Sequence, residues 1–221
     1  MTLFILIVVI AIIGYVAMNI YLHDNSSFYK LTGYSYFDLV TKKKVRMTYK
    51  LVKAIEITNG PQKILVNLQV PSNGELHEID AVLLHETGIY VINVKEMTGW
   101  INGREQDIHW TQLLHGNKSN LFDNPIHETK RLKYALQDQL PEVDENLFDT
   151  LVIFTNDCSF QQIEMLSEDT EVIKVSELKK WGSTLNGEKR LSQTEIETLY
   201  ASLESMMNVK NTTFKLQNSV A

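Results

Sequence analysis

The stretch HEIDAVLLHETGIYVINVKEMTGW, residues 77–100, decides the fold of this chain. Two apolar runs, residues 78–84 and 89–95, flank the tetrapeptide HETG, whose last residue, Gly88, can adopt a positive φ. This pattern predicts an antiparallel β-hairpin. Hydrophobic residues occupy both faces of the two runs, so we expect both strands to lie inside a sheet that is covered on both sides.

The register of this hairpin brings polar side chains together on one face. A four-residue loop pairs Leu84 with Ile89, and the same register extends toward the open end of the hairpin. It predicts two cross-strand polar pairs, Asp80 with Asn93 and Glu78 with Lys95. Cβ atoms of such pairs are about 5 Å apart. Because burying unpaired charges is costly, the cluster must be internally paired, bind a metal ion or lie where the sheet opens.

Helical and strand patterns alternate on both sides of the hairpin. We expect helices near residues 40–57, 124–140, 176–181 and 192–207, and further strands at 64–70, 100–110, 151–155 and 171–175. Asn124 and Pro125 are typical of an N-cap and a first helical position, and SQTE at residues 192–195 is a capping box. The order of elements predicts an α/β protein with a central mixed sheet flanked by helices.

The N-terminus carries one long apolar run, residues 3–22, without a charged side chain. A helix of this length spans roughly 30 Å, the thickness of the hydrocarbon core of a bilayer. A cleaved signal peptide is the competing interpretation, but no Lys or Arg precedes the run, the run is too long, and no small-x-small cleavage site stands near its end. We therefore expect a retained transmembrane helix.

Charge and cysteine usage indicate the side of the membrane on which the body lies. The cluster KKKVR, residues 42–46, follows the apolar run, and the positive-inside rule then places the C-terminal domain in the cytoplasm. A single cysteine, Cys158, cannot form an internal disulfide. The formal net charge of −6 argues against a broadly basic surface for nucleic acid, and the basic cluster is more typical of contact with anionic lipid.

An ordered set of short motifs resembles a known family. GELHEIDAVLLHETGIYVINVKEMTGWING at residues 74–103, Trp110 and NPIHETKRL at residues 124–132 resemble the nuclease-related (NERD) domain, a branch of the PD-(D/E)xK nuclease superfamily. The resemblance extends from about Lys44 to Phe154. It implies a restriction-endonuclease-like fold with an αβββαβ core. It also implies that Asp80 binds Mg²⁺ and that Lys95 is the catalytic lysine that orients the attacking water on DNA.

The chain departs from the family pattern within the site itself. Asn93 stands where the family has the Glu of the Glu-x-Lys motif, and the helix near residues 46–52 lacks an acidic residue that the family usually has. Glu78 and Glu128, in contrast, add carboxylates where the family tends to have Gln. If both approach Asp80, the charges of the metal site have moved instead of being lost.

Two functions therefore stay open. The first is a membrane-anchored, Mg²⁺-dependent nuclease with catalytic residues Asp80, Lys95 and Asn93 and metal ligands Asp80, Glu78 and Glu128. The alternative is an inactive nuclease fold that binds nucleic acid or a protein partner at the membrane, with a Glu78–Lys95 ion pair beside an Asp80–Asn93 hydrogen bond. The expected parts are a transmembrane helix (3–22), a juxtamembrane connector (23–39), the NERD domain (40–160), a helical extension packed on it (161–207) and a flexible tail (208–221).

Overall fold

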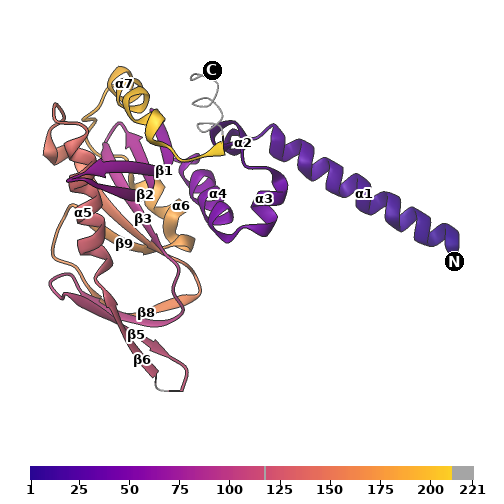
Figure 1. Cartoon of the computed structure of the whole chain (residues 1–221), viewed down its shortest axis with the longest axis horizontal. Coiled ribbons are helices and arrows are strands. Elements are labelled where there is room, and N and C mark those ends of the chain that lie inside the picture. The colour runs from indigo at the N-terminus through magenta and orange to yellow at the C-terminus, as the bar shows by residue number, and fades with distance from the viewer. Residues whose placement is uncertain (117, 211–221) are drawn as a thin grey trace. The chain divides into compact units, whose positions relative to one another are not determined.

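The structure, a computed structural model, describes residues 1–116 and 118–210 (Figure 1). The predicted flexible tail, residues 208–221, lies outside the described residues from position 211 onward. The chain divides into two compact units. One comprises residues 1–53 together with the chain from Val209, and the other comprises residues 54–208.

The larger unit is built on a five-stranded mixed sheet with the strand order β1-β2-β3-β7-β9. Its strands are β1 (Gln62–Ser72), β2 (Glu75–His85), β3 (Gly88–Lys95), β7 (Phe148–Phe154) and β9 (Thr170–Lys174). Strand β2 is antiparallel to both β1 and β3, whereas β7 runs parallel to both β3 and β9. The α/β class and the mixed sheet predicted from the sequence are confirmed.

The hairpin register predicted from residues 77–100 is confirmed near the turn, where Leu84 pairs with Ile89 and the same register continues to the pair Ala81 and Ile92. The two predicted polar pairs, Asp80 with Asn93 and Glu78 with Lys95, are wrong, because β2 and β3 are not paired beyond Ala81 and Ile92. The loop is shorter than expected, because His85 still pairs with Gly88 and only residues 86 and 87 form the turn. Every residue from Gly88 to Asn93 is buried, as expected for a strand in the middle of a covered sheet.

A second sheet of four strands, which the sequence did not predict, follows the hairpin. Its order is β6-β5-β4-β8, formed by β4 (Gly99–Arg104), β5 (His109–Leu114), β6 (Lys118–Asp123) and β8 (Cys158–Glu164). The single strand expected at residues 100–110 was wrong, because a turn at residues 105–108 divides this stretch between β4 and β5. The expected helical extension from residue 161 likewise begins inside β8 and includes β9. These strands are short and largely exposed, so hydrophobic alternation did not mark them.

An apolar cluster joins the two sheets. Trp110 of β5 is fully buried and stacks on Phe154 of β7, with ring centroids 6.2 Å apart and planes within 2°. Its indole Nε1 donates a hydrogen bond to the carbonyl oxygen of Arg104 at 3.0 Å. The other buried members of the cluster are Ile101, Ile126, Val152 and Cys158. Trp100 of β4, in contrast, is 41% exposed.

Helices complete the larger unit. They are α5 (Pro125–Asp138), α6 (Leu178–Thr184) and α7 (Gln193–Leu203), with three short 3-10 helices, η1 (Glu145–Leu147), η2 (Val175–Glu177) and η3 (Glu204–Met206). The predicted N-cap of α5 is confirmed, because the Asn124 side chain accepts the Ile126 N–H at 2.9 Å. The predicted capping box of α7 forms between Ser192 and Glu195.

The smaller unit contains α1 (Thr2–Asp24), α2 (Ser27–Thr32), α3 (Tyr36–Thr41) and most of α4 (Lys43–Ile55). No residue in the most apolar 18-residue window of α1 is buried. The helix is long and apolar enough to cross a membrane. Its C-terminal end is attached to the rest of the unit through His23. The His23 ring is buried, lies within hydrogen-bond distance of the Tyr34 carbonyl oxygen at 2.7 Å, and contacts the Phe28 and Tyr36 rings edge-on.

The contact between Gly103 and Trp110 generates a stability prediction. A Cβ atom on Gly103 would lie 2.1 Å from Cδ2 of the buried indole, which has no room to move. We expect Gly103→Ala to lower the free energy of unfolding by about 1–3 kcal/mol, the usual cost of overpacking a core. Urea unfolding of the full chain in detergent, followed by tryptophan fluorescence, measures this change.

Gly187→Ala is the matched control, because nothing lies within 4 Å of a Cβ at that position. Its effect should stay within about 0.5 kcal/mol. Equal stability of the two variants would contradict the proposed packing of Trp110.

Candidate functional site

Strands β2 and β3 separate where the polar side chains begin. The pairing of β2 with β3 ends at Ala81 and Ile92, whereas β3 remains paired with β7 as far as Lys95. Beyond that point the Val94 N–H donates to Oδ2 of Asp80 at 2.8 Å, so a side-chain carboxylate replaces a backbone acceptor. We call this region the fork. A buried backbone N–H needs an acceptor, and this requirement fixes the position of the half-buried Asp80 carboxylate.

Asn93 lies in β3 and faces α5. Its side chain is buried, and Nδ2 donates to Oγ1 of Thr129 at 3.2 Å. That hydroxyl in turn donates to the Pro125 carbonyl oxygen at 2.7 Å. The amide nitrogen of Asn93 is therefore committed to α5, and its carbonyl oxygen is the atom that can accept a hydrogen bond or bind a cation.

Lys95, two residues further along β3, contacts a carboxylate from the helix. Its Nζ lies 2.5 Å from Oε2 of Glu128, and the two side chains are 21% and 37% exposed. The sequence alone paired Lys95 with Glu78, but the structure places Glu128 beside it. Glu78 is exposed on β2, where it pairs with Gln69 of β1. The fork thus unites Asp80, Asn93, Lys95 and Glu128, residues from three elements.

The donor atoms at the fork suit a hard divalent cation. The Asp80 and Glu128 carboxylates and the Asn93 carbonyl are oxygen donors, which Mg²⁺ prefers. Within residues 1–116 and 118–210, no three or more His, Cys, Asp or Glu side chains gather into a group that could hold a metal. The two carboxylates and the amide are thus donors of the kind that Mg²⁺ prefers, and ligation by Asp80, Glu128 and Glu78 stays a prediction.

The position of Glu128 depends on how the start of α5 is fixed. Asn124, its N-cap, also donates through Nδ2 to three carbonyl oxygens of the β4–β5 turn. They belong to Arg104 at 3.3 Å, Glu105 at 2.9 Å and Asp107 at 2.7 Å. One side chain therefore caps the helix and ties it to the second sheet, one turn before Glu128.

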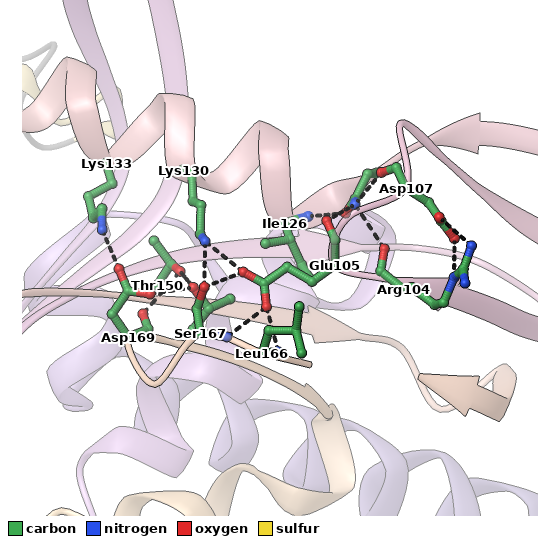
Figure 2. A network of polar contacts seen from close by, with 12 residues as sticks. Arg104, Glu105, Asp107, Ile126, Lys130, Lys133, Thr150, Leu166, Ser167 and Asp169 are labelled. Carbon is green, nitrogen blue, oxygen red and sulfur yellow. Dashed lines mark hydrogen bonds and ion pairs between the residues drawn. The ribbon is translucent and has the colours of Figure 1, made fainter. Parts of the chain in front are cut away.

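A buried carboxylate strengthens this attachment, as Figure 2 shows. Glu105 is 6% exposed and accepts hydrogen bonds from Lys130 Nζ at 2.7 Å, from the N–H groups of Leu166 and Ser167 at 2.7 and 2.8 Å, and from the Ser167 hydroxyl. Burial raises the pKa of Glu105, but these donors, with Lys130 first, outweigh it and lower the pKa to about 2. The carboxylate is therefore charged at neutral pH and links α5 to the segment between β8 and β9.

Further along α5, Lys133 forms a second link to the same segment. Its largely buried ammonium lies 2.6 Å from Oδ2 of Asp169 (Figure 2). Sequence analysis identified Asp80, Asn93, Lys95 and Glu128, but it missed Thr129, Glu105, Lys130 and Lys133. Only the N-cap role of Asn124 had a local signal. The contacts of Lys130 with Glu105 and of Lys133 with Asp169 join residues 25 and 36 positions apart, and no spacing rule connects them.

Comparisons with known proteins place the chain beside one family and one relative. A family model described as the nuclease-related domain, NERD, matches residues 42–155. An uncharacterized protein of Bacillus anthracis is 28% identical over 168 residues, which cover 73% of this chain and 76% of that protein. No solved structure matches the chain.

The Glu105 network predicts a pH dependence of stability. The folded-state pKa of about 2 lies below the ordinary 4.5, so the contribution of Glu105 is complete above pH 4.5 and is lost as the pH falls from 4.5 toward 2. We expect Glu105→Gln to lower the free energy of unfolding by about 3 kcal/mol at pH 7. The difference from the wild-type chain should shrink below pH 4.5, as measured by urea unfolding across this range.

Glu142→Gln serves as the control, because Glu142 is an exposed loop residue. Its effect should stay within about 0.5 kcal/mol at every pH. A Glu105→Gln difference that does not change between pH 7 and pH 3 would contradict the charged network.

Proposed function

We propose, on the premise that this chain belongs to the nuclease-related domain family, that it hydrolyses phosphodiester bonds of DNA with the help of Mg²⁺. The membership follows because the NERD model matches more than half of the residues of this chain. The family membership gives a nuclease-related fold, and folds of the PD-(D/E)xK type commonly use divalent metals. The fork is the proposed active site.

The contact between Lys95 and Glu128 carries this proposal. A family member with Asn93 in the Glu-x-Lys motif lacks one carboxylate, and one anionic ligand holds Mg²⁺ less tightly than two. Oε2 of Glu128, on α5, lies 2.5 Å from Nζ of Lys95. The helix therefore supplies a carboxylate at the fork, where β3 carries Asn93 in place of the Glu of the motif.

Each residue at the fork has a distinct proposed role. Asp80, Glu128 and the Asn93 carbonyl oxygen would hold Mg²⁺, which when bound would supply stabilisation of negative charge on the attacking water and on the phosphate. Lys95 gives up its contact with Glu128 and donates to the attacking water or a phosphate oxygen. The Val94 N–H and the Thr129 hydroxyl hold Asp80 and Asn93 in place.

A second function is favoured by the same ion pair. In the structure the Lys95 charge is balanced by Glu128, and no group of three acidic or metal-binding side chains forms among the described residues. A fork in which Lys95 and Glu128 are already paired suits an inactive domain that binds nucleic acid or a protein partner. The two functions differ in whether Lys95 stays paired with Glu128 or leaves this carboxylate, which would then be available to hold Mg²⁺.

We further propose that α1 anchors the chain in the cell membrane as a single-pass helix, with the larger unit in the cytoplasm. The helix carries no charged residue between positions 3 and 22, and its apolar side chains are exposed. Lys42, Lys43, Lys44 and Arg46 follow it and favour the cytoplasmic side.

Plasmid nicking by the full-length chain in detergent tests the proposed activity. We expect Mg²⁺-dependent nicking, and we expect Asp80→Asn and Lys95→Met to slow it by roughly 10²- to 10⁴-fold, because each removes a group that acts on the reacting phosphate. Glu128→Gln should mainly raise the Mg²⁺ concentration at half-maximal rate. No nicking by the wild-type chain at millimolar Mg²⁺ or Mn²⁺ would reject the nuclease and leave the binding function.

Two further variants serve as controls for this experiment. Asn93→Glu restores the acid of the Glu-x-Lys motif, and it should lower the Mg²⁺ requirement and partly rescue Glu128→Gln. Glu78→Gln measures whether the exposed carboxylate of β2 takes part, and a rate unchanged within about twofold would remove it from the ligand set.

Reporter fusions test the topology. A reporter that is active only in the cytoplasm, fused after Ala221, should be active, because the basic residues after α1 stay on that side. The same position fused to a reporter that is active only outside the cytoplasm should be silent. The opposite pattern would reverse the proposed orientation.

A further inference from the structure

Helix α3 has the reverse of the usual arrangement of polar and apolar residues. Phe37 is 62% exposed and Val40 is 52% exposed, and their spacing places them on one face. Asp38 lies between them in sequence and is buried, with only 8% of its surface exposed. A short helix on a water-exposed surface normally buries its apolar residues and exposes its acid.

The inverted arrangement is held by ion pairs. Asp38 accepts hydrogen bonds from the N–H and hydroxyl of Ser35 at 2.9 and 2.8 Å, and it forms ion pairs with Lys42 at 2.9 Å and Lys210 at 2.5 Å. These four contacts fix the rotation of α3. Phe37 and Val40 are thus kept on the exposed face by the charges on the opposite side.

The exposed apolar pair lies close to the end of the proposed anchor. His23, in the last turn of α1, contacts the ring of Tyr36 at the start of α3, with centroids 6.0 Å apart. If α1 spans a bilayer, this contact keeps the start of α3 near the membrane surface. Exposed apolar side chains at that depth can enter the boundary between lipid headgroups and acyl chains.

Positive charge gathers around the same helix. Residues 23–53 carry seven Lys or Arg and two Asp, a net charge of +5, in a chain whose formal net charge is −6. Arg46 donates to the carbonyl oxygen of Val40 at 2.8 Å, so its guanidinium lies at the C-terminal end of α3. Basic side chains beside exposed apolar ones complement a surface that is both anionic and apolar, and a bilayer with acidic phospholipids is such a surface.

We propose that α3 and the following basic segment, residues 36–46, dock on the surface of an anionic bilayer, with Phe37 and Val40 inserted and Lys43, Lys44 and Arg46 at the phosphates. This inference rests on the proposed anchoring by α1. Docking would hold the smaller unit against the headgroups instead of leaving it on a free tether.

A fluorescent label at Phe37 tests the docking. The full-length Phe37→Cys chain, labelled with an environment-sensitive maleimide, is placed in nanodiscs of phosphatidylcholine alone or with phosphatidylglycerol. The single native cysteine, Cys158, is 2% exposed, and labelled wild-type chain measures its background. We expect blue-shifted emission, about twofold brighter in the anionic discs, and a return to water-like emission near 1 M NaCl, where the Debye length is about 3 Å.

Further variants separate the causes of this signal. Val40→Cys should respond as Phe37→Cys does, whereas Leu166→Cys, on the exposed surface of the larger unit, should give equal emission in both discs. Lys43→Gln with Lys44→Gln should weaken the response to anionic lipid. Water-like emission at both α3 positions in anionic discs would overturn the proposal.

Two outcomes show whether the anchoring by α1 or the docking of α3 has failed. A chain that leaves the discs in alkaline carbonate lacks the anchor, and the proposal falls with it. A chain that stays in the discs with water-like labels has the anchor but does not dock. A blue shift that appears in neutral discs only after a DNA duplex is added would assign the basic segment to nucleic acid and overturn the lipid assignment.

Discussion

The hydrogen bonding of β3 is the constraint on which the site depends. This buried strand is paired with β7 along its whole length, but with β2 only from Gly88 to Ile92. The unequal pairing leaves the Val94 N–H on the side of β2, and the Asp80 carboxylate accepts it. A buried donor without an acceptor costs free energy, so the backbone itself holds a carboxylate at the end of the strand where Asn93 and Lys95 lie.

The second requirement is that α5 is positioned so that Glu128 lies beside Lys95. Its start is tied to the β4–β5 turn by Asn124 and Glu105, and its middle is tied to the segment before β9 by Lys133. Charged groups are stable at such buried positions only when nearly every polar atom has a partner, and Glu105 meets this condition with four donor groups. The second sheet therefore serves as the support that carries Glu128 to Lys95.

Charge is distributed unevenly between the two ends of the chain. Residues 23–53 carry a net charge of +5, so the remaining residues carry a net charge of −11. A basic segment next to an apolar helix suits a membrane surface, whereas an acidic body is repelled from anionic lipid and from DNA alike. Because Glu128 balances the charge of Lys95, a nuclease of this composition would need the charge of a bound divalent cation at the fork to hold a phosphate.

The sequence by itself determined the class of the fold, the hairpin, its register and the cap of α5, because these features depend on periodicity and on residues close together in the chain. It placed Asp80, Asn93 and Lys95 at one end of two neighbouring strands. Only the tertiary structure decided that Lys95 contacts Glu128, 33 residues away, and that β4, β5, β6 and β8 form a second sheet. The choice between Glu78 and Glu128 depends on where the crossover after β3 places α5, and long-range contacts, not local pattern, fix that position.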